Sequence, residues 1–359
     1  MDRIIVFEDH VQRRIDLVKQ LRQRLKKIPI EIVEGQGEQE QNKTYEAQLG
    51  DLLQRKAPDG AMIVCDKDLS NLGRQFVGLS GTTVATVADS LGFPLCLYAR
   101  GEREPRGEEL LKSLAPWEKK RIILNYTTEE TLARECVCIF RAFSYIEKSY
   151  LDLKKEDRTT PAATLSRILE RPGIEDRIAI YGSGEQGLLE EIMPFLKGNR
   201  VKTEKELTKR MTRILGNWLY TSILRFPGIL VSMVPAASYL NIDPRDFIKA
   251  DVQKLFKRAK YKGPFSDLRD WWWRYEFDDL LKQSSSEDGW DFAKKKGIRV
   301  RQCMDPQTNT RAGFYCMVTE KPVSDNNSKS GISWFPAGSD LARIRLDKFN
   351  ELAPWVGLY

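Results

Sequence analysis

Short apolar runs recur five times in the first 126 residues and are separated by polar or amphipathic segments. Runs of this length bounded by turn residues are typical of buried strands. Between them, apolar residues return at spacings of three and four, as in Val11, Ile15 and Val18, which predicts amphipathic helices. The expected strands are Ile4–Phe7, Ile28–Val33, Ala61–Asp66, Phe93–Tyr98 and Arg121–Asn125, and the expected helices are 11–25, 45–53, 82–91 and 108–114. Strands alternating with helices predict a flavodoxin-like α/β domain with a five-stranded parallel sheet.

The remaining pattern is mostly helical and ends in β-like alternation. A long helical repeat covers 129–156, and a charged, proline-ended stretch at 154–161 is the expected linker. From Ile298 the alternation at 298–303, 313–319 and 332–335 predicts a small antiparallel sheet before a terminal helix at 346–352. We therefore expect four parts: an α/β domain at 1–128, a connector at 129–160, a basic helical domain at 161–297 and a β-rich subdomain at 298–359.

Composition narrows the class of protein. The chain has 359 residues, 30% of them charged, and no apolar run approaches the ~20 residues of a membrane helix. The N-terminus lacks the shape of a secretory signal, so we expect a cytoplasmic protein without membrane contact. Six cysteines in a chain of this length are expected to be buried thiols rather than a disulfide scaffold. The single histidine, His10, excludes most histidine-dependent catalysis.

Acidic residues follow two of the predicted strands. Glu8 and Asp9 come directly after the first, and Asp66 ends the third, with Asp68 two residues later. Because the carboxyl ends of parallel strands lie at one edge of a sheet, these acids are expected to meet there. Clustered carboxylates are ligands for Mg²⁺.

This arrangement resembles the receiver domain of two-component response regulators. In that family an acid pair follows the first strand, here Glu8 and Asp9, and a phosphoacceptor aspartate ends the third, here Asp66. The resemblance implies that Glu8, Asp9, Asp66 and the carbonyl of Asp68 hold Mg²⁺, and that Asp66 attacks a phosphoryl group. It also implies a phosphorelay role in signal transduction.

Two positions depart from the receiver pattern. Ala99 stands where the family has a threonine or serine, and Asn125 falls where it has a lysine. The resemblance thus also fits a degenerate pseudo-receiver. Glu8 with Asp66 and Asp68 is similar to Toprim domains as well, which would make the chain a Mg²⁺-dependent phosphodiesterase or nuclease. In a non-catalytic interaction scaffold the acids would serve as helix caps.

The middle of the chain carries most of the positive charge. Residues 193–262 contain 15 Lys and Arg against 5 Asp and Glu, a surplus that exceeds the net charge of +7 for the whole chain. Two predicted amphipathic helices, at 202–218 and 244–260, place cations opposite an apolar face, and the second could be the third helix of a helix-turn-helix. A cationic stripe suits a phosphate backbone, so nucleic acid is an expected partner. The proposed contacts are Lys202, Lys205, Lys209, Arg213, Lys249, Lys257 and Lys260.

Two further motifs have structural alternatives. Gly182, Gly184 and Gly187 match G-x-G-x-x-G, which would bind a dinucleotide only if Arg177–Tyr181 were a strand; a turn between helices is the alternative. Trp271, Trp272 and Trp273 could stack on bases or pack in a core. At helical spacing the three tryptophans cannot share one face, so at least one is expected to be exposed or at an interface.

These observations favour a signalling or regulatory protein rather than an enzyme. The receiver-like domain would control how the basic domain engages nucleic acid or a protein partner, which includes a second copy of the chain. The Toprim-like enzyme and the scaffold remain the two alternatives.

Overall fold

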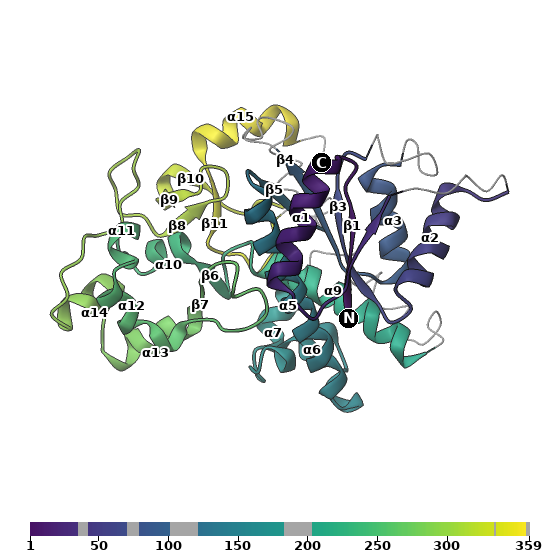
Figure 1. Ribbon diagram of the computed structural model, residues 1–359. Coiled ribbons are helices and arrows are strands. Elements are labelled where there is room, and N and C mark those ends of the chain that lie inside the picture. Colours follow the sequence, from purple (N-terminus) through teal and green to yellow (C-terminus); the bar gives the residue numbers. More distant parts are fainter. Residues whose placement is uncertain (35–41, 70–78, 101–120, 183–202, 334, 357–359) are drawn as a thin grey trace. The chain divides into compact units, whose positions relative to one another are not determined.

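The computed structural model describes residues 1–34, 42–69, 79–100, 121–182, 203–333 and 335–356 (Figure 1). The expected helix at 108–114, the last two glycines of the G-x-G-x-x-G motif and Lys202 lie outside these residues. The chain divides into two compact units. Within the described residues, unit 1 holds 1–100, 121–168 and 203–217, and unit 2 holds 169–182 and 218–356.

Unit 1 is built around a parallel sheet of five strands in the order β2-β1-β3-β4-β5. This is the strand order of flavodoxin-like folds, as the sequence predicts. Every neighbouring pair is parallel, and Phe7 on β1 lies opposite Cys65 on β3. The strands are β1 (Arg3–Phe7), β2 (Ile30–Val33), β3 (Ala61–Asp66), β4 (Leu95–Arg100) and β5 (Ile122–Tyr126).

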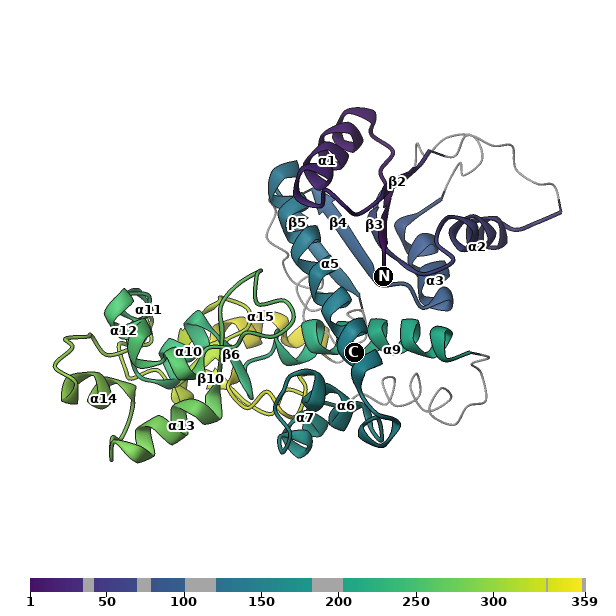
Figure 2. The ribbon, with the colours of Figure 1, turned by 60° about the horizontal axis from the view of Figure 1, so that its bottom comes forward.

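Helices cover both faces of this sheet (Figure 2). Helices α2 (Tyr45–Lys56) and α3 (Gly81–Leu91) pack over one face around a core that includes Ile63 and Leu53. Helices α1 (Val11–Arg24) and α5 (Glu129–Asp152) lie together on the other. Polar side chains cap these helices as local chemistry dictates: His10, Thr44, Ser80 and Thr128 accept backbone N–H groups at the four N-termini.

Three further helical segments belong to the described part of unit 1. They are the 3₁₀ turn Lys155–Asp157, α6 (Pro161–Ile168) and α9 (Glu204–Trp218), whose last residue begins unit 2. Helix α9 packs closely on α5, because a Cβ at Gly216 would lie 2.2 Å from the Phe143 ring. The contact therefore requires glycine at this position of α9.

Unit 2 is mostly helical. Its helical segments are α7 (Glu175–Gly182), the π-helical turn Leu219–Ile223, α10 (Met233–Tyr239), α11 (Pro244–Phe247), α12 (Ala250–Leu255), the 3₁₀ turns Lys257–Ala259 and Asp325–Asn327, α13 (Arg274–Gln283), α14 (Gly289–Lys295) and α15 (Leu346–Val356). Two findings here differ from the sequence predictions. Arg177–Tyr181 is helical, which removes the strand that a dinucleotide motif requires. The stretch from Pro244 to Lys260 is broken into α11, α12 and a 3₁₀ turn, so no single third helix forms.

Two small sheets belong to unit 2. One pairs β6 (Leu230–Ser232) with β7 (Trp271–Trp273). The other has four strands in the order β10-β11-β8-β9, from β8 (Phe314–Cys316), β9 (Lys321–Val323), β10 (Ser328–Lys329) and β11 (Ala342–Arg345). The C-terminal sheet is mixed rather than antiparallel, since β11 pairs with β8 in parallel. The sheet contains neither residues 298–303 nor the described part of 332–335, which are irregular chain. The alternation of apolar and polar residues in these two segments therefore does not form the predicted strands.

The three consecutive tryptophans are all buried, at 2%, 1% and 3% exposure. The expectation that one would be exposed is wrong because the segment is a strand covered on both faces, by the core around Trp272 and by Tyr261 beside Trp271 and Trp273. Trp272 joins the core of unit 2 against Phe247, and Trp271 donates its indole N–H to the carbonyl oxygen of Leu224 at 2.9 Å. Tyr261 lies edge-on to Trp271 and Trp273. The tryptophan cluster is therefore core, and it offers no stacking platform for bases.

Candidate acidic metal site

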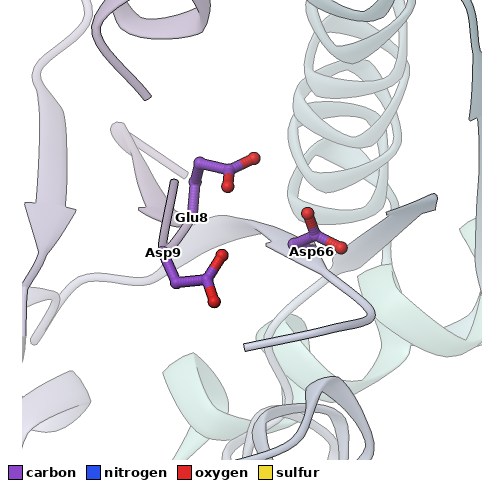
Figure 3. Close-up of side chains that lie close together, drawn as sticks. All are labelled: Glu8, Asp9 and Asp66. Carbon is purple, nitrogen blue, oxygen red and sulfur yellow. The ribbon is translucent and has the colours of Figure 1, made fainter. Parts of the chain in front are cut away.

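The acids at the carboxyl edge of the sheet come together as predicted. Oxygens of Glu8, Asp9 and Asp66 all lie within 4.8 Å of one another (Figure 3). The cause is the strand register: Phe7 pairs with Cys65, so the residues that follow, Glu8 and Asp66, leave adjacent parallel strands at the same level. Asp9 is the next residue along the chain, immediately before the cap of α1.

Glu8 is almost fully buried, with 1% exposure, and its side chain is held in place at both oxygens. The backbone N–H of His10 donates to Oε1 at 2.8 Å, and the hydroxyl of Tyr98 donates to Oε2 at 3.0 Å. Burial raises the pKa of Glu8 to about 7, and the negative charges of Asp66 and Asp9 add to the effect against the two hydrogen bonds. The folded chain thus pays a free-energy cost to keep this carboxylate ionised.

Asp66 shares this environment. Its exposure is 7%, and burial raises its pKa above the ordinary aspartate value, while the backbone N–H of Asp68 donates to Oδ1 at 3.0 Å and opposes the shift. The carboxylate of Asp68 itself is exposed and is not part of the cluster. The structure therefore brings together the three predicted carboxylate ligands, and the backbone N–H of Asp68 supports one of them; the Asp68 carbonyl as a metal ligand stays a prediction.

Tyr98 is the residue of the candidate site that the sequence did not identify. It lies on β4 opposite Asp66 and is fully buried, with its ring edge-on to Tyr126. Burial raises the pKa of Tyr98, so its hydroxyl stays protonated and donates to Glu8. The only sequence signal was a polar-tipped residue near the carboxyl end of an apolar strand.

The cluster fits a small divalent cation by the chemistry of its donors. Carboxylate oxygens are the ligands that Mg²⁺ takes, and a cation bound here would offset the repulsion that Asp66 and Asp9 exert on the buried Glu8. A bound Mg²⁺ would supply Lewis-acid charge at this edge, with Glu8, Asp9 and Asp66 as its ligands. In the part of the chain that the structure describes, Ala99 pairs with Asn125 on the two adjoining strands, so neither position supplies a hydroxyl or a cation.

The predicted nucleic-acid contacts are distributed over both units. On α9, Lys209 donates to the carbonyl of Pro58 at 2.7 Å and Arg213 donates to Asp89 at 3.1 Å. Lys205 forms an ion pair with Asp59. Three predicted cations of α9 thus bind unit 1 itself, at the amino-terminal edge of its sheet.

The cations of unit 2 are also mostly paired. Lys249 contacts Asp246 at 2.8 Å and Lys260 contacts Asp270 at 2.9 Å, whereas Lys257 is exposed and has no acidic partner among the described residues. Most of the predicted cations are therefore engaged by acids or carbonyls of the protein itself. Nucleic-acid binding stays a prediction.

Comparison of the chain with protein-family models, with curated proteins and with solved structures finds no match. Two other observations bear on its class. No helix within the described ranges is long and apolar enough to cross a membrane. All six cysteines are buried and free, as the sequence predicts.

Proposed function

We propose that the protein is a regulatory protein whose receiver-like unit 1 binds Mg²⁺ at Glu8, Asp9 and Asp66 and responds to the metal rather than to a phosphorylation cycle. The observation that carries the proposal is the convergence of three acids from β1 and β3 at one buried edge. The alanine at position 99 and the asparagine at position 125 favour a pseudo-receiver, because the phospho-switch that the resemblance implies needs a hydroxyl and a lysine there.

The Toprim-like alternative has less support. It requires the carboxylates of Asp66 and Asp68 to act together with Glu8, but the Asp68 carboxylate lies outside the cluster. The observed trio, with Asp9 as its third member, is the one that the receiver resemblance implies. In the regulatory proposal, unit 2 carries the output, by contact with a protein partner or with nucleic acid.

Mg²⁺ titration of the full chain by calorimetry tests the metal site. We expect saturable binding that weakens about tenfold or more in Asp66→Asn, because one of three charged ligands is lost. Asp68→Asn is the matched control: the same chemical change two residues away, which keeps the backbone N–H on Asp66. Its affinity should stay within about twofold of the parent chain. A parent chain that binds no Mg²⁺, or equal losses in both variants, contradicts the proposal.

Incubation with a small phosphodonor and Mg²⁺ tests the absence of a phosphorylation cycle. We expect no phosphoryl adduct in the intact mass, since Ala99 and Asn125 provide no partner for the added oxygens. An adduct that forms on the parent chain and disappears in Asp66→Asn would replace the pseudo-receiver with a working phosphoacceptor. The metal-binding result would stand in either case.

A further inference from the structure

A groove lies along α1 in unit 1, beside the edge strand β2. Its volume is about 520 Å³. Its apolar lining consists of Ile15, Val18 and Ile32, and its cationic lining consists of Lys19, Arg22 and Lys26. We call it the α1–β2 groove. All of these lining residues except Ile32 lie on α1 or directly after it, at helical spacings of three and four. The groove therefore follows one stripe of the helix.

The apolar part of this groove is incompletely covered. Ile15 is 53% exposed, and Val11, one turn earlier on α1, is 58% exposed. Val18, which lines the groove together with Ile15, is recessed, with 4% exposure. Single exposed apolar side chains are common, but neighbours at i and i+4 beside a recessed apolar floor are typical of a protein docking surface.

The rim of the groove is positively charged. From Val11 to Lys27 the sequence holds seven Lys and Arg and one acid, Asp16. Two of these cations have acidic partners in unit 1, Arg14 with Glu34 and Arg24 with Glu130. The three cations at the groove, Lys19, Arg22 and Lys26, pair with no acid in the described part of the chain. Charge complementarity therefore calls for an acidic ligand.

We propose that the α1–β2 groove docks an amphipathic, acidic helix of a partner protein. The apolar stripe of that helix contacts Ile15, Val18 and Ile32, and its flanking Asp and Glu residues pair with the three cations of the rim. The stretch from Ile15 to Lys26 is roughly 16 Å long, which matches about three turns of a partner helix. The site involves neither Mg²⁺ nor the acidic cluster.

The shape of the groove distinguishes this partner from two others that are also acidic. A nucleic-acid backbone offers phosphates but no apolar stripe for the recessed Val18 and the half-exposed Ile15. An anionic bilayer accepts a convex apolar helix face, whereas this apolar surface is hollow. A helix presents side chains of the right size and can carry both chemistries on one face.

A labelled synthetic peptide tests the proposal by fluorescence anisotropy with the full chain. The probe is a short helix-forming peptide with leucines at helical spacing and glutamates at the flanking positions; matched peptides carry glutamine or lysine instead of glutamate. We expect only the glutamate peptide to bind well, and Ile15→Glu and Arg22→Glu each to weaken it about tenfold or more. Arg55→Glu on α2, an equal change of charge at an exposed position of unit 1, should leave binding within about twofold.

Four results would overturn it. Equal losses in Arg22→Glu and Arg55→Glu would reduce the effect to overall charge, and equal binding of the glutamine peptide would remove the role of the rim. Sedimentation that shows a dimer lost in Ile15→Glu would make a second copy the occupant. Binding of duplex DNA or of phosphatidylserine vesicles that is lost in Ile15→Glu would assign the groove to that class instead. Because Ile15 is half-exposed, Ile15→Glu should keep its fold, which circular dichroism verifies.

Discussion

Without metal at pH 8, Glu8→Gln is expected to unfold at higher denaturant concentration than the parent chain. Burial and two neighbouring acids raise the pKa of Glu8 to about 7, whereas the unfolded chain has an ordinary glutamate pKa near 4.5. An acid whose pKa is raised by folding binds its proton more tightly in the folded state, so it weakens stability as pH rises through this interval. Above pH 7 the cost reaches about 3 kcal/mol.

Glutamine removes this cost and keeps one of the two local hydrogen bonds, because its single carbonyl oxygen accepts from the His10 N–H or from the Tyr98 hydroxyl. The lost hydrogen bond offsets the gain by about 1 kcal/mol. Asp66 and Asp9, which repel the ionised Glu8, face a neutral amide instead. The advantage of Glu8→Gln should therefore grow between about pH 5 and pH 8 and vanish below pH 4.5, where both chains are neutral at this position.

Added Mg²⁺ should reverse the order of stability. At a thousandfold excess over its dissociation constant, the metal stabilises the parent chain by about 4.1 kcal/mol, which exceeds the cost of the ionised Glu8, and Glu8→Gln gains much less. Urea unfolding of both chains at pH 5 and at pH 8, each with and without Mg²⁺, measures the difference in their free energies of unfolding under the four conditions. Asp68→Asn controls for the loss of one exposed negative charge. A parent chain whose stability does not fall between pH 5 and pH 8 would show that Glu8 is not buried as an acid.

The acidic site was predictable because its geometry follows from backbone rules. Two apolar strands that each end at an acid, in a sheet whose connections make them parallel, must deliver Glu8 and Asp66 to one edge. The capping residues Thr44, Ser80 and Thr128 and the left-handed Gly92 after α3 follow from equally local chemistry. The sequence therefore determines unit 1 in nearly every element that the structure describes.

Unit 2 was less predictable because distant partners decide its local structure. The three tryptophans form a strand because Leu230–Ser232 pairs with them, a contact across forty residues that no periodicity reveals. The helix also breaks between α11 and α12, directly after Asp246 and Phe247. The Asp246 carboxylate accepts hydrogen bonds from the backbone N–H and the guanidinium of Arg301, a distant partner that local sequence does not reveal. Distant partners also determine the environment of the cations on α9 in unit 1. Lys209 donates to the Pro58 carbonyl and Arg213 donates to Asp89, contacts that the helical pattern does not predict.

Gly228→Ala is expected to be the most damaging small substitution in unit 2. A Cβ at this position would lie 2.0 Å from the carbonyl oxygen of Gly338 and 2.0 Å from the hydroxyl of Tyr181. Neither neighbour has room to move: Tyr181 is fully buried, donates to the carbonyl of Phe226 at 3.2 Å and accepts the N–H of Ile229 at 3.0 Å. The expected loss of stability is about 3 kcal/mol or more.

A double-mutant cycle locates the source of this loss. Tyr181→Phe alone leaves the Ile229 N–H and the Phe226 carbonyl without the hydroxyl, which costs about 1 to 2 kcal/mol. In that background Gly228→Ala meets only the Gly338 carbonyl, so the two losses should sum to more than the double variant shows. Gly313→Ala is the matched control, because its Cβ has nothing within 4 Å. Urea unfolding followed by tryptophan fluorescence, to which the buried Trp271–Trp273 strand contributes, reports the outcome. Additive losses would place the strain elsewhere.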